Sequence, residues 1–307
     1  MNRIDMSVDI AGVRLMNPVT TASGTFSVRD SGRFYDISLL GAVTTKGIAA
    51  EPWEGNPTPR IAESYGGMLN SIGLQNPGVD RYIEEELPLL RSFNIPIIAN
   101  VAGKSADDYI RVVEKLNVTD VSMLEINVSC PNIKEGGISF GTDAKMAGAL
   151  TREIRKITKK PLIVKLTPNV TDITAVAKAV ESEGADCVSL INTLLAMRID
   201  VRRKRPVLAN VMGGLSGPAI KPVAVRMVYQ VRRAVKIPII GMGGILTGED
   251  AAEFLMAGAD AVSVGTAALV YPTAPVDVLE GLKAFMEEQG YKNIRELKDS
   301  FDEGVGI

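Results

Sequence analysis

The chain has 307 residues, 46 % of them hydrophobic, a formal net charge of −2, no histidine, and two cysteines, Cys130 and Cys187. The balanced charge argues against a nucleic-acid surface, and the lack of a long apolar run or a signal-peptide pattern predicts a cytoplasmic protein without a membrane span. Without histidine or a CxxC pair, a Ser-His-Asp triad, histidine-bound metals and a four-cysteine iron–sulfur cluster are excluded, and proton transfer is left to Cys, Lys, Glu, Asp or Tyr.

Short apolar runs rich in β-branched residues recur after an N-terminal segment, residues 8–19, that resembles a hairpin plugging the bottom of a barrel. The runs span residues 19–24, 43–47, 97–103, 123–130, 162–169, 187–193, 239–245 and 261–267. Helical patterns lie between most of them, at residues 107–116, 144–158, 173–184, 222–235 and 248–259. Continuous apolar runs suit parallel strands that are buried on both faces. Eight strands alternating with helices predict an α/β fold, a (β/α)8 TIM barrel, and an undivided composition predicts one domain over residues 1–307.

Two connections are long for a barrel, residues 48–96 after the second strand and 194–238 after the sixth. Long connections usually carry function, so we expect both insertions at the active-site face. The only tryptophan, Trp53, is expected to pack the first insertion. The second insertion carries a basic cluster, RIDVRRKR at residues 198–205, which is either a solvated loop or a docking surface for an acidic partner.

Polar residues and glycines close the apolar runs, at the strand ends where barrel enzymes carry their chemistry. Amide and lysine side chains are poor strand formers, so several of them, each closing an apolar run, predict a shared cavity. In chain order these ends are Ser23, Lys46, Asn100, Asn127 with Cys130, Lys165, Asn192 with Thr193, Gly243 with Gly244, and Gly265 with Thr266.

The last two strand ends are rich in glycine. GMGGI (241–245) and VGTA (264–267), with GGLSGP (213–218) upstream, offer backbone N–H groups that could approach a phosphate, although some of these glycines could simply form tight turns. Their spacing does not match the GxGxxG pattern of a dinucleotide-binding fold. Two lysines in one cavity would repel each other unless a ligand brings negative charge. These residues predict a phosphorylated cofactor, for which a flavin is well suited, and a small polar, anionic ligand.

Cys130 lies in NVSCPN (127–132), where it could be a core residue, a metal ligand, a disulfide partner or a catalyst. A free thiol has a pKa of about 8.5, close to operating pH. Its position at a strand end, in a chain without histidine, favours a general base. The glycine-rich segment that follows, residues 131–142, suits a mobile lid or an ordinary loop. Cys187 comes early in the sixth run and is expected in the core.

Six motifs, in order along nearly the whole chain, resemble the class 1 dihydroorotate dehydrogenases and, within them, the catalytic subunit of class 1B. They are NSIGLQNPG (70–78), NVSCPN, KLTPN (165–169), GGLSGPAIKP (213–222), GMGGI and VGTA. The resemblance implies FMN-dependent oxidation of (S)-dihydroorotate to orotate in de novo pyrimidine biosynthesis. It also implies a homodimer of this chain within a heterotetramer, whose partner subunits carry FAD and a [2Fe–2S] cluster and pass electrons to NAD+. It implies no metal site, nucleic acid or membrane for this chain.

Position by position, the resemblance implies that Cys130 takes the C5 proton and FMN the C6 hydride, while Lys46 contacts both flavin and substrate. The implied substrate-binding residues are Lys46, Asn70, Ser71, Ile72, Gly73, Leu74, Asn127, Asn132, Asn192 and Thr193. The implied FMN-binding residues are Ser23, Thr45, Lys46, Asn100, Asn127, Lys165, Ile191, Gly217, Gly243, Gly244, Gly265 and Thr266.

Three alternatives compete with this interpretation. A class 1A enzyme would pass electrons to fumarate by itself, and oligomeric state or partner co-purification would distinguish it. A dihydrouridine synthase would use cysteine and FMN on tRNA, but the net charge of −2 and the absence of an added RNA-binding domain argue against it. A barrel retained only for binding or structure would not need Lys46, Cys130 and the asparagine set intact.

Overall fold

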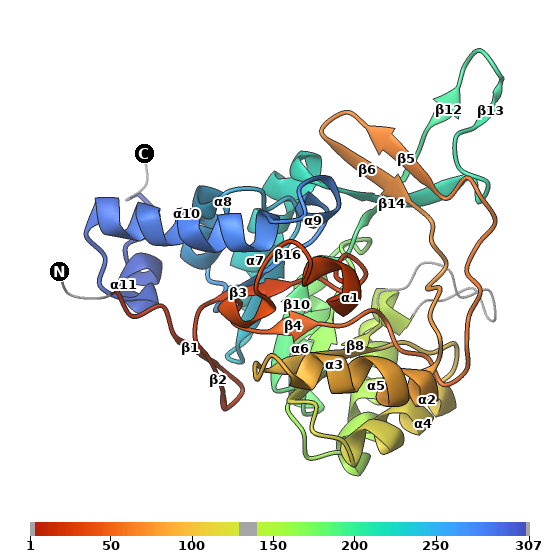
Figure 1. Cartoon of the computed structure of the whole chain (residues 1–307), viewed down its shortest axis with the longest axis horizontal. Coiled ribbons are helices and arrows are strands. Elements are labelled where there is room, and N and C mark those ends of the chain that lie inside the picture. Colours follow the sequence, from red (N-terminus) through yellow and green to blue (C-terminus); the bar gives the residue numbers. More distant parts are fainter. Residues whose placement is uncertain (1–3, 129–139, 305–307) are drawn as a thin grey trace.

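The computed structural model describes residues 4–128 and 140–304, so the predicted site residues Cys130 and Asn132 lie outside the described part. Its centre is an eight-stranded parallel sheet in the order β3-β16-β15-β10-β9-β8-β7-β4 (Figure 1). The strands are β3 (Val19–Thr21), β4 (Val43–Thr44), β7 (Ile97–Val101), β8 (Met123–Asn127), β9 (Leu162–Lys165), β10 (Cys187–Leu190), β15 (Ile239–Met242) and β16 (Ala261–Val264).

The two ends of this sheet meet, which closes it into a barrel. Gly41 N donates to Val19 O at 2.9 Å, and Thr44 N donates to Thr21 Oγ1 at 2.9 Å, so the segment entering β4 lies against β3. The predicted (β/α)8 barrel and its eight strands are therefore confirmed. The predicted runs extend past the strand ends, because the polar and glycine residues that close them already belong to the loops above the barrel.

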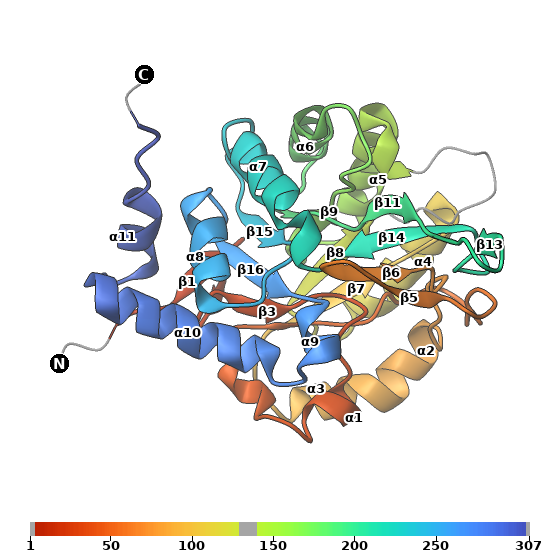
Figure 2. The same ribbon diagram turned by 90° about the horizontal axis from the view of Figure 1, so that it is seen from above.

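Helices surround the barrel strands (Figure 2), and all five predicted helical patterns form helices. Ser105 begins α4 with a capping box to Asp108, and Thr247 begins α8 in the same way with Asp250. The longer helices are α4 (Ala106–Asn117), α5 (Ala144–Ile157), α6 (Ile173–Ser182), α7 (Lys221–Arg232), α8 (Gly248–Met256) and α10 (Ala274–Gln289). The shorter ones are α1 (Val28–Ser31), η1 (Ile37–Leu39), α2 (Val79–Arg81), the π-helix η2 (Tyr82–Glu86), α3 (Leu87–Arg91), η3 (Phe140–Thr142), η4 (Pro218–Ile220), α9 (Ala267–Val270) and α11 (Ile294–Asp299). No helix in the described ranges is long and apolar enough to cross a membrane.

The N-terminal hairpin, β1 (Val8–Ile10) paired with β2 (Val13–Leu15), plugs the bottom of the barrel as predicted. Ile10 and Leu15 are fully buried and join an apolar cluster with inward-facing residues of the barrel strands. Cys187 belongs to this cluster, with no exposed surface, and burial raises the pKa of its thiol well above the ordinary value. The prediction that Cys187 is a core residue is confirmed.

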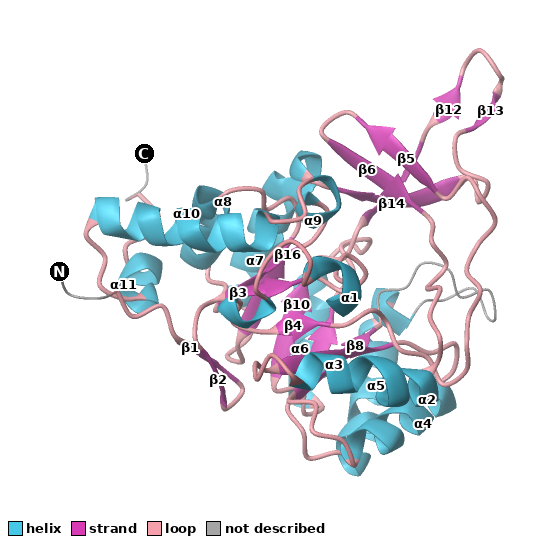
Figure 3. Ribbon diagram, in the orientation of Figure 1, coloured by secondary structure: helices cyan, strands magenta, loops and turns pink. Residues whose placement is uncertain are grey.

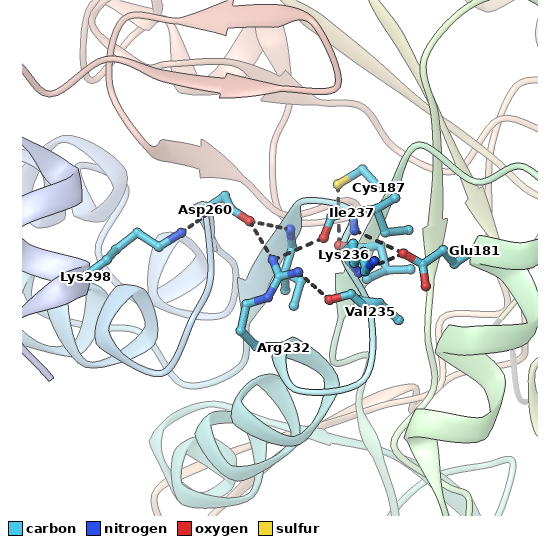
Figure 4. Close-up of polar contacts among 10 residues, drawn as sticks. Glu181, Cys187, Arg232, Val235, Lys236, Ile237, Asp260 and Lys298 are labelled. Carbon is cyan, nitrogen blue, oxygen red and sulfur yellow. Dashed lines mark hydrogen bonds and ion pairs between the residues drawn. The ribbon is translucent and has the colours of Figure 1, made fainter. Parts of the chain in front are cut away.

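An aspartate fixes the lower end of the last strand to its neighbours (Figure 4). Asp260 accepts a hydrogen bond from Ile239 N at 2.8 Å and forms ion pairs with Arg232 of α7 and Lys298 of α11. All three charged side chains are largely buried, with exposed fractions of 23–28 %. One carboxylate therefore joins two helices to the barrel floor.

Replacing Asp260 with alanine is expected to lower the free energy of unfolding by about 2–3 kcal/mol, because it leaves two half-buried cations without their partner. Asp120→Ala is the matched control, since the Arg91–Asp120 pair is about half exposed and worth less than about 1 kcal/mol. Chemical denaturation of both variants measures the difference. Equal losses would mean that the Asp260 cluster has no special structural role.

The two insertions meet in one four-stranded sheet with the order β11-β14-β6-β5. Figure 2 labels all four strands, and Figure 3 shows β14 beside β6 and β5. The first insertion supplies β5 (Ile61–Ser64) and β6 (Gly67–Asn70), and the second supplies β11 (Leu194–Met197) and β14 (Met212–Ser216). This joint sheet follows the sixth barrel strand at once, since only Ile191, Asn192 and Thr193 separate β10 from β11. The sequence predicted two insertions on the active-site face, but not that they pair with each other.

The basic cluster lies in a separate two-stranded arm, β12 (Ile199–Asp200) with β13 (Arg205–Pro206), which projects from the molecule in Figure 1. The side chains at residues 201–205 of this arm are exposed. The backbone of Trp53 pairs within the first insertion, whereas its ring contacts Lys104 outside that insertion. Its backbone exchanges hydrogen bonds with Asn76 at 3.0 and 3.1 Å, and Lys104 Nζ lies 4.9 Å from the centre of its ring.

Candidate functional site

The strand ends bring the predicted polar residues to one face of the barrel. Asn127 on β8 pairs in register with Lys165 on β9, and Asn100 on β7 pairs with Glu125 on β8. Asn100, Asn127 and Lys165 are 0, 6 and 5 % exposed. Lys46 follows β4, and a methyl group placed on Gly24, after β3, would lie 3.4 Å from its Nζ. Two lysines and two asparagines thus stand at the C-terminal ends of four barrel strands.

A buried carboxylate lies beneath this face and was not predicted as a site residue. Glu125 is 2 % exposed and accepts hydrogen bonds from Asn100 Nδ2 at 2.5 Å and from Ser189 Oγ at 2.7 Å. Thr45 Oγ1 accepts from the backbone N–H of Asn100 at 3.1 Å. The sequence held a signal for Glu125, because an acidic residue in the middle of the apolar run MLEIN is costly unless it is hydrogen-bonded.

Lys165 carries a positive charge into this enclosed space. Among the described residues, it forms no ion pair and no hydrogen bond of its side chain with another residue, although it is only 5 % exposed. Burying an ammonium group without a counter-charge is unfavourable. A lysine in this position is therefore suited to an anionic or electron-rich ligand.

Three glycine-rich segments converge beside the lysines. A methyl group on Gly217, which has φ +97°, would lie 2.8 Å from Gly67 Cα at the start of β6. One on Gly244, with φ +83°, would lie 2.8 Å from the carbonyl oxygen of Gly217. Thr266 Oγ1 donates to Ser216 Oγ at 2.7 Å and so ties the loop after β16 to the end of β14. These close approaches form a cradle of backbone groups that a side chain would block.

Replacing Gly244 with alanine is expected to weaken FMN binding by roughly tenfold, because the added methyl group would lie 2.8 Å from Gly217 O and from Lys221 Cβ and would push apart the loops whose backbone N–H groups are expected to meet a phosphate. Gly12→Ala is the matched control: Gly12 also has φ +83° but has nothing within 4 Å of the added methyl group. Both variants pay the left-handed backbone cost of about 1–2 kcal/mol, but only Gly244→Ala should lose affinity. Titration of the two apoproteins with FMN measures their affinities. Equal FMN affinities of Gly244→Ala and Gly12→Ala would mean that Gly244 does not belong to the cofactor site.

Several residues predicted to bind substrate lie in the first insertion or directly before the second. Asn70 ends β6, and its Nδ2 donates to the carbonyl oxygen of Gly214 at 3.4 Å. Ser71 follows it and is 3 % exposed, with no hydrogen-bond partner for its Oγ in the described structure. Asn192 Oδ1 accepts from the N–H of Thr193 at 2.7 Å, just before β11. The joint sheet thus carries the two polar loops of the predicted substrate set.

The rest of the 70–74 loop is held tightly. Gly73 and Leu74 both have left-handed φ values, +74° and +52°. Asn76 Nδ2 donates to Leu74 O at 2.7 Å, and Ile72 O accepts from Asn56 N at 3.0 Å. The loop is therefore fixed by its own insertion, which suits a binding surface.

Asn169 belongs to the motif KLTPN but was not among the predicted site residues. Its Nδ2 donates to Thr193 O at 3.0 Å, and its Oδ1 accepts from Leu195 N at 2.8 Å. Asn169 therefore connects the start of β11 to the loop after β9 by hydrogen bonds. The sequence signal was the motif KLTPN itself, in which Asn169 follows Lys165 by four residues.

The remaining predicted positions lie around the same face. Ile191 is buried, whereas Ser23, Gly243, Gly265 and Thr266 are partly exposed, each just after a barrel strand. The structure therefore groups the described members of the predicted set at the ends of the strands and in the joint sheet. The thiol proposed as base, Cys130, and the substrate residue Asn132 fall outside the described residues.

The described residues fit a phosphorylated flavin. Asn100 Oδ1 is buried and has no hydrogen-bond partner in the described structure, so it can accept one from a ligand. Lys165 forms no ion pair among the described residues, and backbone N–H groups at glycine positions can approach a phosphate closely. These are the kinds of donors and acceptors that a flavin ring and its phosphate require.

Comparison with known proteins agrees with this geometry. The family model described as dihydroorotate dehydrogenase matches residues 5–286. A protein of Alkaliphilus metalliredigens named dihydroorotate dehydrogenase B (NAD(+)), catalytic subunit, is 60 % identical over 98 % of this chain and 100 % of its own length. Proteins with the same name from Geobacillus kaustophilus and Bacillus cereus are 53 and 51 % identical, over 96 and 97 % of this chain and 95 and 96 % of their own lengths. The chain belongs to the dihydroorotate dehydrogenase family.

Proposed function

We propose that this chain is the catalytic subunit of an NAD+-linked dihydroorotate dehydrogenase, which oxidises dihydroorotate to orotate in pyrimidine biosynthesis. One observation carries the proposal: a closed barrel brings Lys46, Lys165, Asn100 and Asn127 to the same face, beside a glycine cradle. The names of the relatives, which align over nearly the whole chain, support the same reaction. They do not favour the fumarate-dependent or tRNA-modifying alternatives.

FMN is the cofactor that this site would hold. Its phosphate would bind at the cradle of Gly217, Gly243 and Gly244 with Gly265 and Thr266, and its ring would lie toward Lys165 and Asn100. When bound, FMN would accept the hydride that leaves C6 of the substrate. The protein's part is to place the ring, to exclude water and to move one proton. The remaining predicted contacts, Ser23, Thr45 and Ile191, line the same strand ends.

The substrate is a cyclic diamide with a carboxylate. Asparagine side chains both donate and accept hydrogen bonds, so Asn70, Asn127 and Asn192 suit the ring amides, and Lys46 suits the carboxylate. The loop that begins at Ser71 would close over one side of the ring. By resemblance, Cys130 would remove the C5 proton and Asn132 would contact the substrate. A cysteine is a reasonable base here because the chain has no histidine.

The electrons must leave this chain for NAD+. Among the described residues, no group of three histidine, cysteine or acidic side chains is placed to hold a metal, and the two cysteines of the sequence cannot ligate an iron–sulfur cluster. A partner subunit with FAD and a [2Fe–2S] cluster would supply the missing path, in a heterotetramer built on a homodimer of this chain. The words "catalytic subunit" in the relatives' names support such a partner.

Reconstitution tests this division of labour. The purified chain with FMN should form orotate with an artificial dye as acceptor, but should reduce NAD+ only after the partner subunit is added. The dye assay serves as the internal control for an active catalytic chain. Reduction of NAD+ at full rate by a preparation without any second polypeptide would contradict the proposed partner.

A further inference from the structure

The side-chain amide of Asn100 is held in one orientation by the buried Glu125. Asn100 Nδ2 lies 2.5 Å from Glu125 Oε1, and Ser189 Oγ lies 2.7 Å from the other carboxylate oxygen. A carboxylate oxygen accepts hydrogen bonds and does not donate them. The atom of Asn100 that faces Glu125 is therefore the amide nitrogen, and the carbonyl oxygen must point the other way.

That carbonyl oxygen lies beside the segment that follows β4. A methyl group placed on Gly47, the residue after Lys46, would lie 3.1 Å from Asn100 Oδ1 and 3.4 Å from Leu74 Cδ2. Asn100 Oδ1 is thus a neighbour of Gly47, next to Lys46, which is one of the predicted cofactor-binding residues. It is enclosed and has no hydrogen-bond partner within the described ranges. A buried acceptor without a donor is costly, so a ligand N–H is expected to satisfy it.

We infer that Glu125 is a positioning residue for the cofactor: by binding the amide nitrogen of Asn100, it makes Asn100 present an acceptor, which selects the N–H group of the oxidised flavin ring. This inference rests on the proposed function, since it assumes that FMN binds at this face. The oxidised ring has a single N–H, at N3, so methylation of N3 removes the only donor on the ring that Asn100 Oδ1 could meet. Ser189 assists by holding the second carboxylate oxygen of Glu125.

Binding of FMN and of N3-methyl-FMN to the apoprotein, measured by flavin fluorescence, tests the inference. The unaltered chain should bind N3-methyl-FMN about tenfold more weakly than FMN, as expected for one lost hydrogen bond in a buried site. In Glu125→Leu, the side-chain amide of Asn100 is no longer held in one orientation. The ratio of the dissociation constants of N3-methyl-FMN and FMN should therefore fall below about twofold. Glu125→Gln keeps an acceptor for Asn100 Nδ2 and should retain most of the preference.

Ser263→Ala is the matched control. Its hydroxyl lies 2.6 Å from Thr20 Oγ1 in the same barrel interior, the residue is 2 % exposed, and it forms no hydrogen bond with Asn100 within the described ranges. It should lose stability and keep the full preference for FMN. Equal binding of FMN and N3-methyl-FMN by the unaltered chain would overturn the inference, whether or not Glu125→Leu folds. An unchanged preference for FMN in a folded Glu125→Leu variant would also overturn it. Failure of the unaltered chain to bind FMN at all would instead refute the proposed function.

Discussion

Replacing Cys130 with alanine is expected to slow dihydroorotate oxidation by about 10²- to 10⁴-fold while FMN stays bound, the usual range for loss of a general base. The proton on C5 lies next to a carbonyl group, and its removal needs a base on the face of the ring opposite the flavin. The chain has no histidine to take over this role. Anaerobic stopped-flow measurement of flavin reduction gives the rate of this step directly, apart from the acceptor.

The two cysteines provide a matched pair for this experiment. Cys130→Ser should retain FMN and regain some rate as pH rises, because a serine hydroxyl has a far higher pKa than a thiol and is deprotonated less readily at neutral pH. Cys187→Ala should lower stability by leaving a small cavity in the barrel floor, yet leave the rate of flavin reduction per folded molecule unchanged. Near-normal flavin reduction in Cys130→Ala would remove Cys130 from the mechanism.

Lys165→Met is expected to change stability and cofactor affinity in opposite directions. Lys165 is 5 % exposed and has no ion pair among the described residues, so replacing its ammonium with an apolar group should stabilise the apoprotein by about 1 kcal/mol. The same change would remove the proposed charge-assisted contact to the flavin and should raise the dissociation constant of FMN by about 10- to 100-fold. Thermal unfolding of the apoprotein and FMN titration measure the two effects.

Lys160→Met is the control for Lys165→Met. Lys160 is half-buried, and its Nζ donates to Thr119 O and Val121 O at 2.9 Å, away from the strand ends that form the site. Burial lowers the pKa of Lys160, yet both hydrogen bonds hold its ammonium in place. Its loss should therefore destabilise the apoprotein and leave FMN affinity unchanged. If both lysine variants behaved alike, the charge of Lys165 would have no role in cofactor binding.

The barrel could be predicted from the sequence because its strands are buried on both faces. Such strands must be continuous apolar runs, and each of the eight runs became a strand. The polar residues at the strand ends could also be predicted as site residues. An asparagine or lysine such as Asn100 or Lys165 at the end of a buried apolar run conflicts with strand propensity and with burial. Cys187 was assigned to the core by its place early in a run.

What could not be predicted depends on contacts between distant segments. The joint sheet pairs β6 with β14, whose residues Asn70 and Gly214 are 144 positions apart, and neither insertion alone shows which edge will meet which. Glu125 was visible as an acidic residue in an apolar run, but its partners Asn100 and Ser189 come from two other strands. The role of Asn169 likewise follows only from its contacts with Thr193 and Leu195.

The most direct test of the central claim is an anaerobic absorbance spectrum of the purified chain, recorded before and after addition of dihydroorotate. The account predicts an oxidised flavin spectrum that bleaches when dihydroorotate is added, which would demonstrate the cofactor, the substrate and the first half-reaction together. A flavin spectrum that remains oxidised would contradict the assignment of dihydroorotate as substrate. A chain that holds no flavin, even after incubation with FMN, would contradict the cofactor site itself.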